Sequence, residues 1–226
     1  MPTFRSASGL WKQFRVEELA TPEAFARDPR TVWEWYAWRR EQVARCLPNA
    51  AHLACARMAL RSAGVTIVTQ NVDGLHAAAA RAEAGSGDPS AAMPIELHGS
   101  LFRDRCASCG APREPEGELS VDASSETTLP RCRCGGLLRP GVVWFGEQLP
   151  ASALEVAFAA ARQADVCLVI GTSAVVYPAA GIAVAAMECG AALIEVNPEE
   201  TPFTPHAAVS LRGTAAATVP QLISAV

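Results

Sequence analysis

Residues 165–173, with the sequence DVCLVIGTS, decide the fold class of this chain. A short β-branched and apolar run that ends in Gly-Thr-Ser is typical of a buried parallel strand followed by a tight turn. We expect this strand over residues 165–170, and similar runs predict strands at 65–69, 94–97, 192–196 and 208–211. Ala-rich stretches that predict helices alternate with them at 151–163, 179–189 and 215–226. The alternation indicates an α/β fold in which helices cover a parallel sheet.

Other segments depart from this alternation. Residues 31–46 and 49–62 predict two helices joined at Pro48, and residues 83–94 predict an exposed loop rich in Gly, Ser, Ala and Pro. Residues 106–134 carry paired cysteines around a polar stretch without apolar periodicity. Such a stretch does not bury a core by itself, so we expect a metal ion to hold it together.

Composition excludes several classes of protein. The 226 residues are 50% hydrophobic and 19% charged, which is typical of a globular chain, and the formal net charge of -4 leaves no basic surface for a phosphate backbone. No uninterrupted apolar run reaches the roughly 18 residues of a membrane span, and the N-terminus lacks the pattern of a signal peptide. We therefore expect a cytoplasmic monomer that binds neither nucleic acid nor membrane.

The paired cysteines form the strongest metal-binding pattern. Cys-x-x-Cys followed by Cys-x-Cys lets two knuckles close a tetrahedron, the geometry of structural zinc, through Cys106, Cys109, Cys132 and Cys134. The tighter second spacing leaves open that one of the four is not a ligand. Zinc ribbons also bind DNA, but the acidic residues of this segment argue against that role: Glu114, Glu116, Glu118, Asp122 and Glu126. We expect the single cysteines to be small buried apolar residues: Cys46, Cys55, Cys167 and Cys189.

Polar groups follow several of the predicted strands. Gly171-Thr172-Ser173 and Asn197-Pro198-Glu199 suit a nucleotide phosphate or ribose, because the carboxyl ends of parallel strands share one edge of a sheet. Residues 69–76 (TQNVDGLH) and 96–100 (ELHGS) add amides, a carboxylate and a histidine. The alternative for each is an ordinary turn, and for the histidine a structural role.

Taken in order, TQNVDGLH, ELHGS, CASC with CRC, RPGVVWFGE, GTS and VNPEE resemble the sirtuins, the NAD-dependent protein-lysine deacylases. The resemblance runs from Pro2 to the C-terminus. It implies a Rossmann-like NAD-binding domain over 1–18, 64–103 and 138–226, and a smaller domain of a zinc ribbon plus a helical module over 19–63 and 104–137. It also implies that one structural zinc ion is bound, and that NAD and an acylated lysine meet in a cleft between the domains.

The resemblance further implies roles for individual residues. His98 is the general base that activates a ribose hydroxyl. Expected NAD contacts on the nicotinamide and ribose side are Phe4, Arg5, Gln70, Asn71, Val72 and Asp73. Those on the adenosine side are Gly171, Thr172, Ser173, Asn197, Pro198, Glu199 and the backbone amide of Ala215. The products are free lysine, nicotinamide and O-acyl-ADP-ribose.

Two further segments bear on the substrate. A strand over residues 142–147 is expected to pair with the substrate peptide by β-addition, through Val143, Trp144, Phe145, Gly146 and Glu147. Tyr36 and Arg39 lie three apart on a predicted helix, so they share a face on which a phenol and a guanidinium can hold a carboxylate. In a desuccinylase-like and demalonylase-like class of sirtuins, such a pair recognises acidic acyl groups. The alternative is that Tyr36 packs and Arg39 is solvated.

Neighbours of that pair carry simpler expectations. Arg40 points off the shared face and is expected to be a surface charge. Trp33, Trp35 and Trp38 do not all share one face, so we expect them to pack around the acyl channel or in the core.

The chain departs from the family at its start. Family members begin with a strand and a Gly-Ala-Gly-x-Ser loop that holds the NAD phosphates, whereas this chain opens at Met1-Pro2-Thr3-Phe4-Arg5. The strand would lie near the middle of the sheet, so its loss would leave buried backbone groups unpaired. We expect a start upstream of this sequence. The alternative is a truncated, catalytically impaired zinc protein that binds acyl-lysine or another protein.

Overall fold

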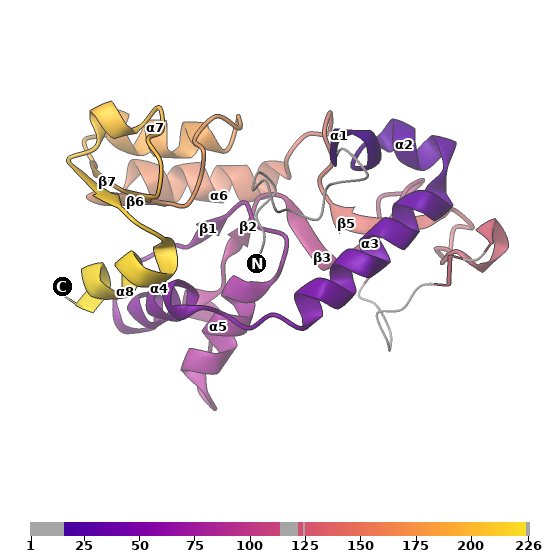
Figure 1. Cartoon of the computed structure of the whole chain (residues 1–226), viewed down its shortest axis with the longest axis horizontal. Helices are drawn as coiled ribbons and strands as arrows, with labels where there is room; N and C mark the ends of the chain where they lie inside the picture. The colour runs from indigo at the N-terminus through magenta and orange to yellow at the C-terminus, as the bar shows by residue number, and fades with distance from the viewer. Residues whose placement is uncertain (1–15, 114–121, 124, 225–226) are drawn as a thin grey trace. The chain divides into compact units, whose positions relative to one another are not determined.

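The parallel strands lie in two groups in the computed structural model, which describes residues 16–113, 122–123 and 125–224 (Figure 1). The first group is the pair β1 (Val68–Thr69) and β2 (Ile95–Glu96). The second group has the order β6, β7, β8 and comprises β6 (Val166–Ile170), β7 (Ala192–Asn197) and β8 (Val209–Arg212). Among the described residues, β1 pairs with β2 alone and β6 with β7 alone.

Helices cover both faces of these strands (Figure 1). One face carries α6 (Ala151–Arg162) and α7 (Ala180–Glu188), and the other carries α4 (Ala50–Arg61), α5 (Leu75–Ala84) and α8 (Ala215–Ser224). Val196 of β7 and Val219 of α8 are fully buried in a cluster with apolar residues of α4. The expected Rossmann-like arrangement of parallel strands between helices is confirmed.

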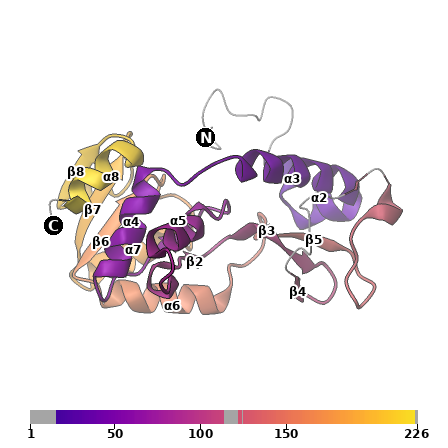
Figure 2. The ribbon, with the colours of Figure 1, turned by 90° about the horizontal axis from the view of Figure 1, so that it is seen from below.

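An antiparallel sheet organises the remaining residues. Its order is β4, β3, β5, with β3 (Gly99–Cys106), β4 (Pro112–Arg113) and β5 (Leu138–Val142). The same unit holds the helices α1 (Val16–Leu19), α2 (Pro22–Arg27) and α3 (Pro29–Ala44), and Figure 2 shows α2 and α3 alongside β3 and β5. Trp33 of α3 is fully buried, and its indole N–H donates to the carbonyl of Leu138 over 2.9 Å, which ties the helix to β5.

The chain folds into two compact units. The antiparallel unit comprises Met1–Cys46, Asn71–Gly74 and His98–Gln148, and the parallel unit comprises Leu47–Gln70, Leu75–Leu97 and Leu149–Val226. These bounds differ from the expected domains at α4, which packs against α5 and α8 in the parallel unit. They also differ at β3 and β5, because pairing with each other keeps both strands in the antiparallel unit.

Most expected elements are present with bounds shifted by a few residues, but α5 was not expected. Its sequence LHAAAARAEA gives weak periodicity because Ala fills both faces, although Ala79 and Ala80 are fully buried. The expected loop 83–94 is partly ordered, since it holds the end of α5 and the 3₁₀ helix η1 (Ser90–Ala92). In the part of the chain that the structure describes, no helix is long and apolar enough to cross a membrane.

Two expectations about exposure are wrong. Arg40 is 1% exposed rather than on the surface, because its guanidinium pairs with Asp104 over 2.6 Å and donates to the carbonyl of Leu101. Cys189 is exposed rather than buried, because it follows the last residue of α7, whereas Cys55 on the inner face of α4 is buried as expected.

Candidate functional site

The turn at His98 joins β2 to β3. Its half-buried histidine is fixed through the backbone, since the carbonyl of His98 accepts a hydrogen bond from the N–H of Val143 over 2.9 Å. Gly99 follows with a φ of +73°, and a Cβ there would collide with the carbonyl of Gly141. Glycine is therefore required beside His98.

Residues 71–74 belong to the antiparallel unit, as does His98. The carbonyl of Val72 accepts from the N–H of Leu101 over 2.8 Å, and the Val72 side chain packs against the core of this unit. Asn71 is exposed and Asp73 half-buried. Gln70 precedes them in the parallel unit, where its amide donates to the Thr172 hydroxyl over 3.4 Å.

The ends of β6 and β7 are joined by side-chain and backbone bonds. The Asn197 amide donates to the carbonyl of Thr172 over 2.7 Å, and the N–H of Gly171 donates to the carbonyl of Val196 over 2.9 Å. Pro198 and Glu199 continue from β7 and are exposed, while Thr172 and Ser173 are half-buried. Two of the polar strand ends expected from the sequence therefore do meet at one edge of a sheet.

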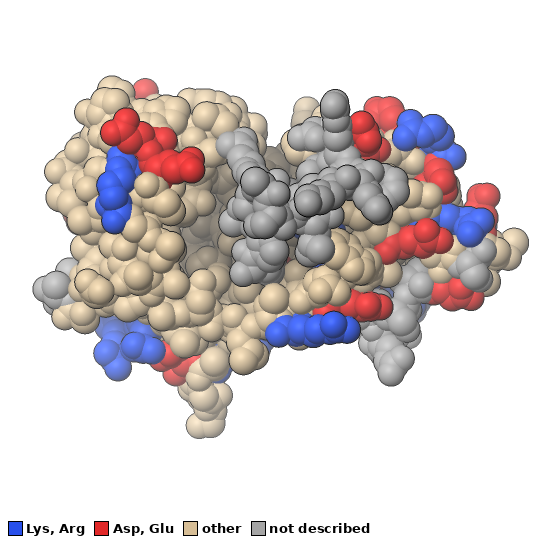
Figure 3. All heavy atoms as spheres, in the orientation of Figure 1, with Lys and Arg blue, Asp and Glu red and all other residues tan. Residues whose placement is uncertain are grey.

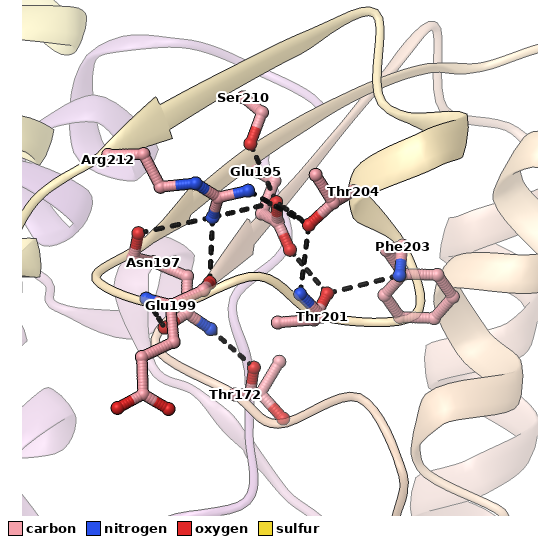
Figure 4. A network of polar contacts seen from close by, with 9 residues as sticks. All are labelled: Thr172, Glu195, Asn197, Glu199, Thr201, Phe203, Thr204, Ser210 and Arg212. Carbon is pink, nitrogen blue, oxygen red and sulfur yellow. Dashed lines mark hydrogen bonds and ion pairs between the residues drawn. The ribbon is translucent and has the colours of Figure 1, made fainter.

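A buried network beneath these strand ends was missed from the sequence (Figure 4). Glu195 of β7 is fully buried, and its carboxylate accepts hydrogen bonds from the hydroxyls of Thr201, Thr204 and Ser210. Arg212, at the end of β8, lies 3.3 Å from the same carboxylate. The signal that could have revealed it is an acidic residue inside the apolar strand LIEV.

Ala215 is the first residue of α8 and packs against the cluster that contains Val196. Phe4 and Arg5 lie outside the described residues, as do Glu114, Glu116 and Glu118.

The segment expected to receive a peptide is a turn and not a strand. Strand β5 ends at Val142, and residues 143–147 form a turn in which the Glu147 carboxylate accepts from the N–H of Trp144 over 2.8 Å. Gly146 has a φ of +84°, which a continuing strand does not allow. The same carboxylate pairs with Arg139 over 2.7 Å and with Arg105 over 3.2 Å. Glu147 thus holds the turn.

Four of the five backbone N–H groups of residues 143–147 already donate inside the antiparallel unit. The N–H of Phe145 donates to the carbonyl of Ala20 over 2.9 Å, and the N–H of Glu147 donates to the carbonyl of Trp144 over 3.0 Å. Val143 donates to His98 and Trp144 to Glu147, as described above. Phe145 nevertheless exposes 54% of its surface.

Tyr36 and Arg39 lie side by side on α3. The Arg39 guanidinium carbon is 5.6 Å from the centre of the Tyr36 ring and 4.8 Å from that of Trp35. Tyr36 is fully buried, and burial raises the pKa of its hydroxyl to about 12. Burial also lowers the pKa of Arg39, an effect that Tyr36 and Asp73 oppose. Trp33 packs in the core, while Trp35 and Trp38 are half-buried.

The four paired cysteines form a compact cluster. Their sulfur atoms lie within 4.8 Å of one another, with 3.5 Å between Cys106 and Cys134 and 3.8 Å between Cys109 and Cys132. A zinc ion bonded tetrahedrally to four sulfurs separates them by about 3.8 Å. The donor set and its spacing therefore fit Zn²⁺.

Proton affinities in the cluster also suit a cation. The backbone N–H groups of Cys109 and Ser108 point at the Cys106 sulfur and, against the opposing effect of burial, lower the pKa of Cys106 to about 6. The N–H of Gly136 lowers the pKa of Cys134, but hydrogen bonds with the other cysteine sulfurs outweigh it and raise the pKa to about 12. Four thiolates this close need a metal ion to ionise together.

A model described as the Sir2 family matches residues 1–178. The chain belongs to the Sir2 family. An NAD-dependent protein deacylase of Thermococcus kodakarensis is 48% identical over 225 residues, which cover 99% of this chain and 84% of that protein.

Solved structures of Sir2 proteins are similar throughout. One described as a Sir2 homolog–NAD complex has a TM-score of 0.85 and 48% identity, and the match covers 99% of this chain and 82% of that one. Another, described as Sir2 bound to an acetylated peptide, has a TM-score of 0.79 and 27% identity over 92% of this chain and 83% of that one. Structures of this family thus include complexes with NAD and with acylated peptide.

Proposed function

We propose that this Sir2-family chain removes acyl groups from protein lysines with NAD, releasing nicotinamide and O-acyl-ADP-ribose. The observation that carries the proposal is the joined polar edge at the ends of β6 and β7, where Asn197 binds the carbonyl of Thr172. Ligands of open parallel sheets bind at this edge. The relationship to an NAD-dependent protein deacylase over 99% of the chain supports the same assignment.

The chain's own residues have distinct tasks in this proposal. NAD, when bound, supplies the ribose carbon to which the acyl oxygen is transferred. Gln70, Asn71 and Asp73 hold the nicotinamide and ribose side, with Val72 anchoring their backbone. His98 accepts a proton from a ribose hydroxyl, because a neutral imidazole is a base near pH 7.

On the adenosine side, we assign contacts to the residues that follow the strands. Thr172 and Asn197 are held by their mutual bond, and Glu199 follows on an exposed turn. The remaining expected contacts of this side are Gly171, Ser173, Pro198 and Ala215.

We further propose that the acyl group includes succinyl and malonyl as well as acetyl. Tyr36 supports this because the Trp144 indole N–H donates to its oxygen over 2.8 Å, which leaves the phenol proton for a second acceptor. A pKa of about 12 keeps that proton in place. Arg39 beside it supplies positive charge, so a carboxylate on the acyl group would meet one donor and one cation.

The peptide that carries the lysine is assigned to residues 143–147. Phe145 offers exposed apolar surface, and Gly146 leaves the turn open to a close approach. Because Glu147 uses its carboxylate within the turn, we assign it the task of shaping this surface rather than of contacting the lysine.

Nicotinamide release by the purified chain tests the proposal. Acetyl-lysine, succinyl-lysine and unmodified-lysine peptides are incubated in parallel with NAD. Release that depends on acylation supports deacylation, and a higher kcat/KM for the succinyl peptide supports the acidic acyl preference. No release from folded, zinc-loaded protein would contradict the function proposed.

One observation favours a second candidate, a catalytically impaired module that binds acyl-lysine. Within the described residues, β1 and β6 each have a single paired neighbour, so the parallel strands form two groups. A sheet divided in this way offers less support for the NAD phosphates. Binding of an acyl-lysine peptide without nicotinamide release would favour this candidate.

Three expectations stay predictions: a cytoplasmic location, a monomeric state and no binding of nucleic acid. On the face drawn in Figure 3, the basic side chains of the described residues, all of them arginines, lie at separate places near Asp and Glu instead of gathering into one extended basic patch. This arrangement supports the prediction for nucleic acid.

A further inference from the structure

Glu195 is fully buried in the middle of β7, where neighbouring positions carry apolar side chains such as Leu193 and Val196. A buried carboxylate is costly unless it is bonded on several sides. Here one oxygen accepts from the Thr201 hydroxyl, and the other accepts from Thr204 and Ser210 over 2.7 Å each. The site is built for a carboxylate.

These partners come from the connection between β7 and β8 and from β8 itself. Thr201 also accepts from the N–H of Phe203 over 3.1 Å, and Thr204 accepts from the N–H of Thr201 over 2.9 Å. The carboxylate therefore organises the connection as well as binding it. Burial alone raises the pKa of Glu195, but the three hydroxyls and the charge of Arg212 outweigh it and lower the pKa.

Arg212 links the Glu195 carboxylate to the backbone at the carboxyl end of β7. Its guanidinium lies 3.3 Å from the Glu195 carboxylate and donates to the carbonyl of Glu199 over 2.7 Å and to that of Asn197 over 3.4 Å. Asn197 in turn bonds the carbonyl of Thr172, as Figure 4 shows. One continuous set of contacts thus runs from a buried charge to three residues assigned to the adenosine side.

We propose that Glu195 is a positioning residue for the adenosine half of NAD, acting through Arg212 on the backbone of Asn197 and Glu199. The proposal rests on the NAD site proposed above. It assigns Glu195 no contact with the cofactor and no part in proton transfer. Replacing Glu195 should therefore weaken NAD binding without changing kcat or the binding of the acylated peptide.

The test compares Glu195→Gln and Arg212→Met with the wild-type chain. Gln keeps the volume of Glu195 but removes its charge. Met keeps an unbranched side chain at position 212 but removes the guanidinium and its bonds to both carbonyls. Arg57→Met is the matched control, because Arg57 pairs with Glu83 over 2.7 Å at the surface of the same unit, away from this network. Each protein is measured for KM of NAD, KM of an acetyl-lysine peptide, kcat, thermal midpoint and Kd of ADP-ribose.

We expect KM for NAD and Kd for ADP-ribose to rise at least about fivefold in both network variants. The peptide KM and kcat should stay within about twofold of the wild type, and the control should change none of these values. Unchanged ADP-ribose binding by folded variants would overturn the proposal. Equal losses in every parameter, in step with the thermal midpoint, would also overturn it, since they would indicate a purely structural role.

Failure of one proposal is distinguishable from failure of the other. If the wild type releases no nicotinamide but binds ADP-ribose, deacylation fails while the Kd values still decide the role of Glu195. If the wild type does not bind ADP-ribose, the positioning role is refuted as well. Should Glu195→Gln not fold, the half-exposed Arg212→Met variant decides the outcome.

Discussion

The indole N–H of Trp144 donates a buried hydrogen bond of 2.8 Å to the hydroxyl oxygen of Tyr36. The Arg139 guanidinium stacks on the Trp144 ring, with its central carbon 3.6 Å from the centre of the ring. Arg139 pairs in turn with Glu147. Tyr36, which is expected to contact the acyl group, is thus linked through Trp144 and Arg139 to the turn that is expected to bind the peptide.

This coupling bears on the acyl preference. Arg39→Met should lower kcat/KM for a succinyl-lysine peptide by about tenfold or more, because it removes the positive charge beside Tyr36. The acetyl-lysine value should change by less than about threefold, since an acetyl group has no carboxylate. Arg45→Met, at the exposed end of the same helix, is the control. Equal losses on both peptides would rule out a carboxylate clamp.

Replacing the predicted base tests the chemistry. His98→Ala should lower the steady-state formation of free lysine from acylated peptide by about a hundredfold or more, because the ribose hydroxyl would lose the base that takes its proton. Zinc content, measured by atomic emission, should not change. His206→Ala, an exposed histidine in the 3₁₀ helix η3 (Thr204–His206), serves for comparison. Retained turnover in His98→Ala would show that the base lies elsewhere.

The buried ion pair between α3 and β3 should matter for stability. Arg40→Met leaves the Asp104 carboxylate, whose side chain is 7% exposed, without its cation. We expect the free energy of unfolding in urea to fall by about 3–5 kcal/mol. Arg57→Met, at a surface pair, should lower the free energy of unfolding far less, because solvent screens an exposed ion pair. A similar small cost for Arg40→Met would mean that Asp104 is bonded adequately without it.

Metal removal should affect the antiparallel unit. Cys109→Ser removes one of four sulfur ligands, so the purified variant should retain less zinc and unfold at a lower temperature. Structural zinc contributes about 10–16 kcal/mol in small domains, which exceeds the stability of most domains. Cys189→Ser changes an exposed single cysteine and should keep one zinc per chain. A fully stable, metal-free wild type would contradict a structural ion.

Protonation of Glu195 should contribute to the loss of folding stability at acidic pH. The pKa of its carboxylate is lower in the folded chain than the ordinary value of 4.5, so folding gains stability from the charge above that pH. This gain is lost as the pH falls from 4.5 through the folded pKa. Unfolding free energies measured from about pH 7 to pH 3 should therefore decline less steeply in Glu195→Gln than in the wild type. Glu188→Gln, at the exposed end of α7, should follow the wild type.

Local patterns in the sequence predicted more of the parallel unit than of the side-chain networks. Composition alone predicts strands such as the one over residues 165–170, and the cysteine spacing alone indicates the metal cluster. Helical spacing predicts a surface position for Arg40 because it separates Arg40 from the face of Tyr36, but the partner that buries it, Asp104, lies 64 positions away in the chain. The burial of Glu195 was equally hard to predict, because the hydroxyls that bind its carboxylate come together only in the folded chain.

The turn after β5 has a consequence for which substrates fit. Its N–H groups at Val143, Trp144, Phe145 and Glu147 all donate within the chain. The N–H of Gly146 takes part in none of these bonds, so a polypeptide lying along this turn would pair mainly by bringing its own amide hydrogens to the carbonyls other than that of Trp144. Proline and N-methylated residues lack that hydrogen, so we expect them to be disfavoured at the substrate positions that face those carbonyls.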